Sequence, residues 1–182
     1  MSTTTDIVIF GAGQIAEVAD ACFTHDSAYR VAAFVVDEAF RKEERFRGRP
    51  VLTLEDAAER FPPRTHAAFV ALSYGNLNRL RREKCDAMKA AGYRLVSYVS
   101  PRATTFPDLE VGENAFILED NTIQPFVRIG ANVTLWSGNH IGHHAVIEDD
   151  CFLASHVVVS GGVRIGEGTF VGVNVTIRDH VQ

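Results

Sequence analysis

Four histidines lie close together in the second half of this 182-residue chain, and three others are scattered. The clustered residues, all within 17 positions, are His140, His143, His144 and His156. A histidine with an unperturbed pKa of about 6.5 can take a proton from a hydroxyl or an amine that attacks a thioester. That is the work of the general base in acyl transfer. The cluster therefore favours general-base catalysis.

A metal site is the first alternative for the same histidines. His140 could approach one ion together with His143 or His144, but no nearby cysteine or suitably spaced carboxylate completes a coordination shell. We therefore expect no metal. A zinc site shared between the histidines of neighbouring subunits, as in a carbonic-anhydrase-like solenoid, stays open as a separate hypothesis.

The histidines lie within a six-residue repeat that runs from residue 111 to residue 182. All twelve first positions are aliphatic: Val111, Ile117, Ile123, Ile129, Leu135, Ile141, Ile147, Leu153, Val159, Ile165, Val171 and Ile177. A period of six fits neither a helix face nor a series of hairpins. It predicts a solenoid in which each hexad gives one short strand and one corner.

The repeat also predicts which side chains point inward. The fifth position is small or moderately apolar in ten of the twelve hexads, with Asn121 and Asn139 as the exceptions. Because the first and fifth positions fill the interior, His140, His143 and His144 are expected on the outside or at a corner. A histidine buried in the core is thus a weaker explanation for the cluster.

The first half of the chain alternates between apolar strands and helices. We expect strands over 7–10, 31–36, 67–72 and 93–99, and helices over 14–24, 54–60 and 78–91. This alternation predicts a small parallel sheet. Pro101 and Pro107 bracket the change of pattern, so we place the domain boundary near residue 100.

A glycine-rich turn follows the first expected strand. Gly11, Gly13 and Ala16 fit the phosphate-binding fingerprint with alanine in the third place, and Asp37 ends the second strand. The motif predicts a phosphate or nucleotide at the start of a helix. Only three or four strands precede the solenoid, which argues against a complete NAD domain. An ordinary turn residue is an equally good interpretation of Asp37.

Composition narrows the classes of partner. The net charge is -5, and the Arg79 to Lys84 stretch is expected to be the solvated face of a helix, so nucleic acid is not expected as a partner. The chain has no run of 18 apolar residues, and Met1 to Asp6 are polar, which predicts a cytoplasmic protein without a membrane span. Its cysteines, Cys22, Cys85 and Cys151, lack the spacing of a disulfide framework or a zinc site.

The hexads resemble those of the left-handed β-helix acyltransferases, in which three hexads form a triangular coil of 18 residues. This resemblance implies four coils and a homotrimer. It gives the fold class as an α/β Rossmann-like subdomain over 1–100, followed by a left-handed parallel β-helix over 101–182. The left-handed crossovers are implied by the family, since the general rule for parallel strands is right-handed.

Two groups within this family carry a more detailed similarity. The segment from Asn139 to His144 resembles the catalytic stretch of the lipid A pathway's UDP-N-acetylglucosamine acyltransferase. Residues 133–166 are similar to bacterial UDP-amino-sugar N-acetyltransferases, including the bacillosamine-pathway enzyme, and to the sialic-acid O-acetyltransferase-like group. Both resemblances imply that His143 is the catalytic base.

One departure from the bacillosamine-type pattern concerns the residue after the base. That residue is acidic in those enzymes and is His144 here, so the group that orients His143 is open. Three acidic residues, Glu148, Asp149 and Asp150, fall on the next face of the coil. A neighbouring subunit of the trimer is the other source of a carboxylate.

Gly161 lies 18 residues after His143 and is therefore expected one coil along on the same face. The backbone N–H groups of Gly161 and Gly162 could bind the thioester carbonyl of acetyl-CoA and stabilise an oxyanion, as the family resemblance implies for this position. A corner glycine needed only for the turn is an equal alternative.

The remaining candidate contacts concern the substrate. Asn139, His140, His144 and His156 are expected to line the pocket, and an exposed polar face is the competing interpretation. The loop from Leu72 to Asn76 resembles the one after the third strand in the related sugar acetyltransferases. The resemblance implies nucleotide-sugar contacts from Gly11, Gly13, Asp37 and Asn76.

Together these features predict an acetyl-CoA-dependent acetyltransferase that acts on an amine or hydroxyl of a sugar or nucleotide-linked sugar in surface glycan biosynthesis. The competing hypothesis is a non-catalytic trimeric scaffold that binds a nucleotide-sugar. Family members continue with more coils and a closing tail, whereas this sequence stops at Gln182 at the end of a hexad. We therefore expect either a truncated chain or a reduced coenzyme site.

Overall fold

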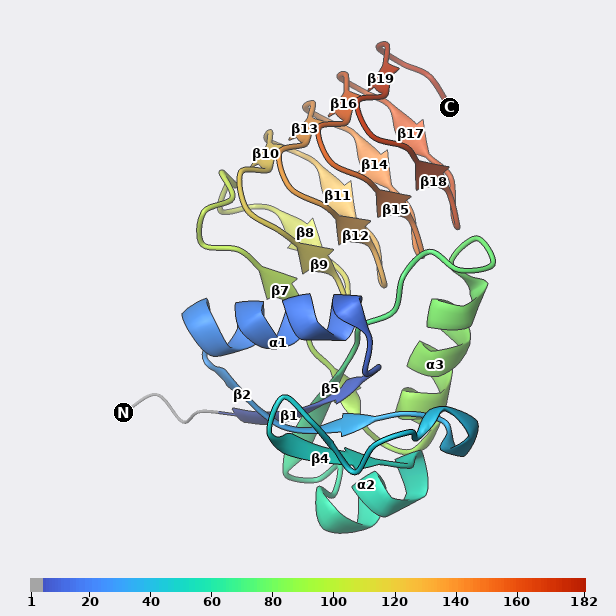
Figure 1. Cartoon of the computed structure of the whole chain (residues 1–182). Coiled ribbons are helices and arrows are strands. Elements are labelled where there is room, and N and C mark those ends of the chain that lie inside the picture. The colour runs from blue at the N-terminus through green and yellow to red at the C-terminus, as the bar shows by residue number, and fades with distance from the viewer. Residues whose placement is uncertain (1–4) are drawn as a thin grey trace. The chain divides into compact units, whose positions relative to one another are not determined.

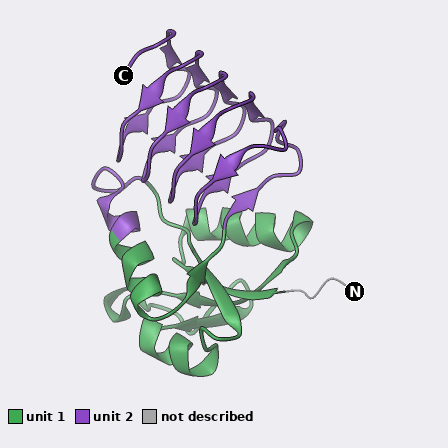
Figure 2. Ribbon diagram, turned by 180° about the vertical axis from the view of Figure 1, so that it is seen from behind, with its two compact units in different colours: residues 1–73, 83–96 green, residues 74–82, 97–182 purple. Residues whose placement is uncertain are grey.

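A computed structural model describes residues 5–182 of the chain, so Met1 to Thr4 of the polar start lie outside the described residues. The chain divides into two compact units, coloured separately in Figure 2. Unit 1 comprises the residues up to Ser73 together with Glu83–Val96, and unit 2 comprises Tyr74–Arg82 together with Ser97–Gln182.

Unit 1 is built on a six-stranded sheet with the order β3-β4-β2-β1-β5-β6 (Figure 1). Its strands are β1 (Thr5–Phe10), β2 (Tyr29–Val35), β3 (Arg45–Phe46), β4 (Arg49–Leu52), β5 (His66–Val70) and β6 (Arg94–Leu95). All neighbouring pairs are parallel except β3 with β4. The predicted parallel sheet is thus confirmed, while β3 and β4 were not predicted, because they are short and contain arginine and proline.

The helices of this half are α1 (Gln14–Asp26), α2 (Leu54–Arg60) and α3 (Arg79–Ala90), with a short 3-10 helix η1 (Glu38–Phe40). Helix α2 begins where the Thr53 hydroxyl accepts a hydrogen bond from the backbone of Asp56, which satisfies one of the donors at its N-terminus. The apolar sides of the helices and strands share a core that includes Val8, Val35 and Val70. Among residues 5–182, no helix has both the length and the apolar character that a membrane span requires.

Unit 2 contains a solenoid of two-residue strands arranged in three parallel sheets (Figure 1). The first sheet holds β10 (Thr122–Ile123), β13 (His140–Ile141), β16 (Val158–Val159) and β19 (Thr176–Ile177); the second holds β8 (Glu110–Val111), β11 (Arg128–Ile129), β14 (Val146–Ile147) and β17 (Arg164–Ile165); the third holds β7 (Tyr98–Val99), β9 (Phe116–Ile117), β12 (Thr134–Leu135), β15 (Phe152–Leu153) and β18 (Phe170–Val171). Within the repeat, each residue pairs with the one 18 positions later, for example Ile123 with Ile141 and Ile141 with Val159. Three parallel sheets and an 18-residue coil agree with the predicted left-handed β-helix.

The interior of the solenoid follows the repeat. The aliphatic first positions and the small fifth positions form one buried cluster, in which Ile141, Ala145 and Val159 are completely covered. The exceptional Asn139 is also buried, at 1% exposure. Its amide donates to the Trp136 carbonyl at 2.6 Å and accepts from the Val157 N–H at 2.8 Å, so it bonds the backbone of two successive coils. The inward asparagines therefore satisfy the backbone of the corners from within.

The fourth residue of every hexad has a left-handed backbone, with φ between 55° and 79°. These residues are Asn114, Asp120, Phe126, Asn132, Gly138, His144, Asp150, His156, Gly162, Gly168, Asn174 and His180. Glycine, asparagine, aspartate and histidine tolerate this conformation better than other residues. Eleven of the twelve positions carry one of these four types, and Phe126 is the exception. The corner geometry thus accounts for the presence of several histidines in the repeat.

Glycines at the second position of the hexad test how tightly the coils stack. A Cβ at Gly130 would lie 2.7 Å from the backbone nitrogen of Asp149, whereas a Cβ at Gly166 meets nothing within 4 Å. We expect Gly130→Ala to lower the free energy of unfolding by about 1–3 kcal/mol, because the added methyl forces two coils apart. Gly166→Ala is the matched control and should change it by less than about 0.5 kcal/mol. Urea unfolding measures both, and equal stabilities would contradict a close contact between these two coils.

Candidate functional site

His143 lies at a corner of the solenoid between β13 and β14, with an exposed side chain. Its backbone N–H donates to the Gln124 side-chain oxygen at 2.9 Å, which fixes the backbone from which the ring projects. The ring Nδ1 lies 3.1 Å from Nδ1 of His144, and the two rings are almost perpendicular at 87°. His143 is thus held at two points, and its ring belongs to the outer surface, as the repeat predicted.

Gly161 stacks against His143, as the 18-residue rule predicted. A Cβ on Gly161 would lie 2.7 Å from Cε1 of the His143 ring, so a larger residue would displace the imidazole. The predicted oxyanion donors already have partners in this structure. The Gly161 N–H donates to Asp179 Oδ1 at 3.1 Å, and the Gly162 N–H donates to the His143 carbonyl at 2.9 Å. An oxyanion at Gly161 would therefore have to replace the Asp179 carboxylate.

His144 occupies a left-handed corner with φ 60° and packs its ring against Phe126, with 4.7 Å between ring centroids and a tilt of 39°. Phe126 lies one coil earlier in the same column and is itself left-handed, with φ 66° and 61% exposure. A left-handed backbone costs a residue with a bulky side chain roughly 1–2 kcal/mol. The strained aromatic residue of the repeat therefore lies directly beside the histidine pair.

The other candidate pocket residues besides His144 are His140, His156 and Asn139. His140 is partly buried in β13, where it pairs with Thr122 and Val158. His156 is an exposed left-handed corner residue in another column, and its ring lies over Gly138. Asn139 points into the core rather than outward, which corrects the expectation that it lines a pocket. His140 and His156 stay predicted substrate contacts, whereas Asn139 has a structural role.

The acidic residues after the histidines bind other groups. Glu148 forms an ion pair with Arg164, and Asp149 accepts a hydrogen bond from the Ala131 N–H at 2.8 Å. The side-chain amide of Asn132 donates a hydrogen bond to Asp150 Oδ1 at 2.6 Å. Within residues 5–182, no group of three His, Cys, Asp or Glu side chains is arranged to hold a metal ion. The group that meets His143 Nδ1 is therefore His144.

Residues 74–82 form a loop and the first turn of α3, and they belong to unit 2. Asn76, Leu77 and Asn78 all have left-handed backbones, and Asn76 is exposed. Tyr74 packs its ring against Phe152 and Phe170, at 5.1 and 4.5 Å between centroids. The loop thus presents Asn76 to solvent, and its role as a nucleotide-sugar contact stays a prediction.

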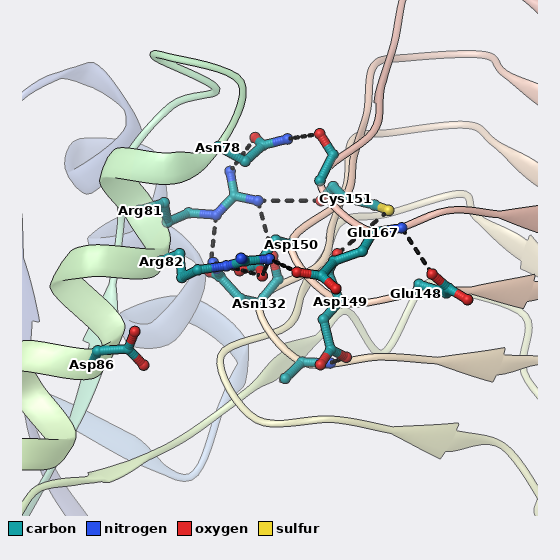
Figure 3. Close-up of polar contacts among 12 residues, drawn as sticks. Asn78, Arg81, Arg82, Asp86, Asn132, Glu148, Asp149, Asp150, Cys151 and Glu167 are labelled. Atoms are coloured by element: carbon teal, nitrogen blue, oxygen red, sulfur yellow. Dashed lines mark hydrogen bonds and ion pairs between the residues drawn. The ribbon is translucent and has the colours of Figure 1, made fainter.

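Arg81 corrects the expectation that the basic stretch of α3 is solvated. Its side chain is 1% exposed and extends from the first turn of α3 to the solenoid backbone (Figure 3). The guanidinium donates to the Asn132 side chain at 2.9 Å and to the carbonyls of Asn132 and Cys151 at 2.8 and 3.2 Å. One side chain therefore fastens two corners of successive coils to residues 74–82 of the same unit.

Arg82 continues this network at the surface (Figure 3). It pairs with Asp150 and Glu167, and the hydrogen bond to Asp150 raises the pKa of the guanidinium. A cavity of about 290 Å³ lies beside this network, lined by Leu77, Asn78, Arg79, Arg82, Asp150, Glu167 and Gly168. Burial beneath the network raises the pKa of the Cys151 thiol to about 11, so this cysteine is unsuited to nucleophilic chemistry at neutral pH.

The glycine turn of unit 1 lies at the carboxyl ends of β1 and β5. A Cβ on Gly11, which has φ +123°, would lie 2.7 Å from the Ala71 carbonyl oxygen, so only glycine fits this close approach. Gly13 precedes α1 and has no side-chain cap, and a Cβ there would meet nothing within 4 Å. Because β2 and β5 flank β1 on opposite sides, the strand order reverses at this point, where open α/β sheets bind ligands.

Asp37 follows β2 and forms an ion pair with Lys84 of α3 at 2.7 Å. Lys84 also lies over the Phe10 ring, 5.4 Å from its centroid. Both charged groups are within unit 1, at the same edge of the sheet as Gly11. Asp37 is therefore partly exposed and forms an ion pair with Lys84, in addition to its position in the turn after β2.

Several residues of this arrangement were not predicted from the sequence. Phe126 precedes His144 by 18 positions, so the stacking rule that identified Gly161 could also have found it. No repeat or motif in the sequence pointed to Gln124 or Lys84. Their roles depend on side-chain reach, since Gln124 spans to the next coil and Lys84 meets Asp37 across 47 positions.

Comparison with known families identifies the repeat. The family described as bacterial transferase hexapeptide (six repeats) matches residues 144–179. The 2,3,4,5-tetrahydropyridine-2,6-dicarboxylate N-succinyltransferase of Methylorubrum extorquens (strain PA1) is 30% identical over 110 residues, which cover 49% of this chain and 39% of that protein. The chain thus spans about two fifths of the length of that curated relative.

Two solved structures share the fold over almost the entire chain. The acetyltransferase domain of PglB from Neisseria gonorrhoeae FA1090 is 21% identical, with a TM-score of 0.84 over 96% of this chain and 83% of that one. PerB from Caulobacter crescentus, in complex with CoA and GDP-perosamine, is 22% identical, with a TM-score of 0.68 over 97% and 90%. The chain thus shares the fold of these two structures, and its residues 144–179 match the hexapeptide repeat of bacterial transferases.

Proposed function

We propose that this protein is an acetyl-CoA-dependent acetyltransferase that acts on an amine or hydroxyl of a nucleotide-linked sugar in surface glycan biosynthesis. The observation that carries the proposal is His143, an exposed imidazole at a solenoid corner, held by Gln124 and His144 and given room by Gly161. The PerB structure, which contains CoA and GDP-perosamine, supports the choice of donor and acceptor.

In the proposed reaction, acetyl-CoA supplies the activated acetyl group. His143 accepts the proton from the sugar amine or hydroxyl as that atom bonds to the acetyl carbon, and the bond from carbon to sulfur breaks. The same proton then leaves with the thiolate, which gives CoA with a neutral thiol. We propose Gly161 and Gly162 as neighbours of the thioester, because Gly161 packs directly against the His143 ring and a side chain there would displace the imidazole.

For the N-terminal part, residues 1–100, we propose a Rossmann-like nucleotide-sugar-binding domain, with the acyltransferase domain over 101–182. The uncapped start of α1 and the open space at Gly13 suit a phosphate group, which favours a helix N-terminus. Gly11 keeps the turn close to β5, and Asp37 offers a carboxylate to the sugar or the nucleoside. Asn76, which belongs to unit 2, is kept as a separate candidate contact. His140 and His156 are retained as candidate substrate contacts, whereas His144 contacts His143 and Phe126.

We further propose a cytoplasmic homotrimer in which acetyl-CoA binds along the solenoid. The cysteines Cys22, Cys85 and Cys151 remain thiols, as is usual in a reducing compartment. In a trimer, the exposed corner that carries His143 could face the solenoid of a second copy. Such an arrangement would complete the donor site with residues from two subunits.

Replacing the base tests the central assignment. We expect His143→Ala to lower kcat by about 10²–10⁴-fold, because the acceptor then loses its proton without a positioned base. The assay measures thiol release from acetyl-CoA with a panel of UDP-, GDP- and dTDP-linked amino sugars. The control is His25→Ala, which removes an exposed histidine at the end of α1 and should leave kcat unchanged. Wild-type turnover by His143→Ala on a working substrate would overturn the assignment.

The glycine turn gives an independent test of nucleotide-sugar binding. We expect Gly13→Ala to fold like the wild type, because the added Cβ meets no atom of the protein. It should weaken binding of the nucleotide-sugar at least tenfold by calorimetry, because the methyl group occupies space proposed for the phosphates. Gly166→Ala, which also adds a methyl group in open space, serves as the control. Unchanged affinity in Gly13→Ala would place the ligand elsewhere.

A further inference from the structure

We infer that His144 is the positioning residue for His143, in the place where a general base commonly has a carboxylate. This inference rests on the proposed acetyl transfer. Three observations carry it: the Nδ1 atoms of the two histidines lie 3.1 Å apart, the His144 ring packs against Phe126, and the acidic residues Glu148, Asp149 and Asp150 bind other groups.

Only one hydrogen can lie between the two Nδ1 atoms, so one ring donates the hydrogen bond and the other accepts it. In one arrangement His143 donates its Nδ1–H to His144, which leaves a lone pair on His143 Nε2 for the substrate proton. In the other, His144 donates and His143 carries its hydrogen on Nε2, where it blocks the base. Orientation of a histidine base by the group at its second nitrogen is the general logic of catalytic dyads and triads.

Protonation of His143 during the reaction distinguishes the two arrangements. When His144 accepts, the contact persists after His143 Nε2 has gained the substrate proton, because Nδ1–H still points at a lone pair. When His144 donates, a protonated His143 would bring two N–H groups together. His144 as the acceptor is therefore the arrangement compatible with both states of the base.

Phe126 holds the acceptor ring in place. It adopts a left-handed backbone that suits asparagine or glycine better, and its ring lies 4.7 Å from that of His144 at 39°. Phe126 keeps this unfavourable backbone beside the histidine pair, so we assign its ring the role of orienting His144.

We expect Phe126→Asn to raise the melting temperature, because asparagine tolerates the left-handed backbone, and to lower kcat, because His144 loses its aromatic contact. If Phe126 had only a structural role, kcat would not fall.

Two substitutions of His144 form a matched pair at the same corner. His144→Gly removes the acceptor, and His144→Asn restores an acceptor oxygen near the position of Nδ1; both residues tolerate a left-handed backbone. We expect His144→Gly to lower kcat roughly tenfold or more with little change in KM for the sugar, and His144→Asn to recover most of that loss. Asp120→Gly, another left-handed corner whose side chain forms an exposed ion pair with Arg102, should leave both parameters unchanged.

A readout without turnover separates this inference from the proposed function. Nitrogen-15 NMR of histidine-labelled wild-type protein should show His143 with its hydrogen on Nδ1, and His144→Gly should lose this preference. If the wild type transfers acetyl groups but His144→Gly has normal kcat, or if His143 carries its hydrogen on Nε2, the positioning role is wrong. If the wild type transfers no acetyl groups but His143 carries its hydrogen on Nδ1, the proposed function is wrong, whereas the positioning of His143 by His144 still holds.

Discussion

The chain turns a corner at the fourth residue of each hexad, where the backbone adopts a left-handed conformation in all twelve repeats. This corner directs one short strand into the next sheet and brings each residue beside the one 18 positions away. Few side chains tolerate the conformation, and histidine is one of them. The same geometric requirement therefore builds the solenoid and admits imidazoles to its outer edges.

A histidine in such a repeat can be there because it tolerates a left-handed corner or because it has a chemical role. His156 and His180 are left-handed corner residues whose rings lie over glycines of the preceding coil, Gly138 and Gly162. His143 occupies the third position and needs no left-handed backbone. Its side chain is thus explained neither by the corner nor by the core, and the same holds for His140 in β13, so these two members of the cluster call for a chemical role.

The Arg81 network fixes the segment that precedes the solenoid in unit 2. A guanidinium with 1% exposure binds corner groups of Asn132 and Cys151, and Arg82 joins Asp150 at the surface. Buried arginine is tolerated because each of these donors has an acceptor. The network keeps residues 74–82 on the third sheet, where Tyr74 packs against the rings of Phe152 and Phe170.

Much of the solenoid and part of the site follow from the sequence alone. A strict period of six with aliphatic first positions determines the coils, and the 18-residue step predicts that Gly161 stacks on His143, because both are local consequences of the backbone repeat. The tertiary structure decided what depends on the reach of side chains: that Asn139 turns inward to bond the corners, that Arg81 is buried, and that His143 meets His144 instead of an acidic residue. Periodicity specifies where a Cβ points, whereas the partner of a flexible polar side chain depends on which of several nearby groups already have their hydrogen bonds.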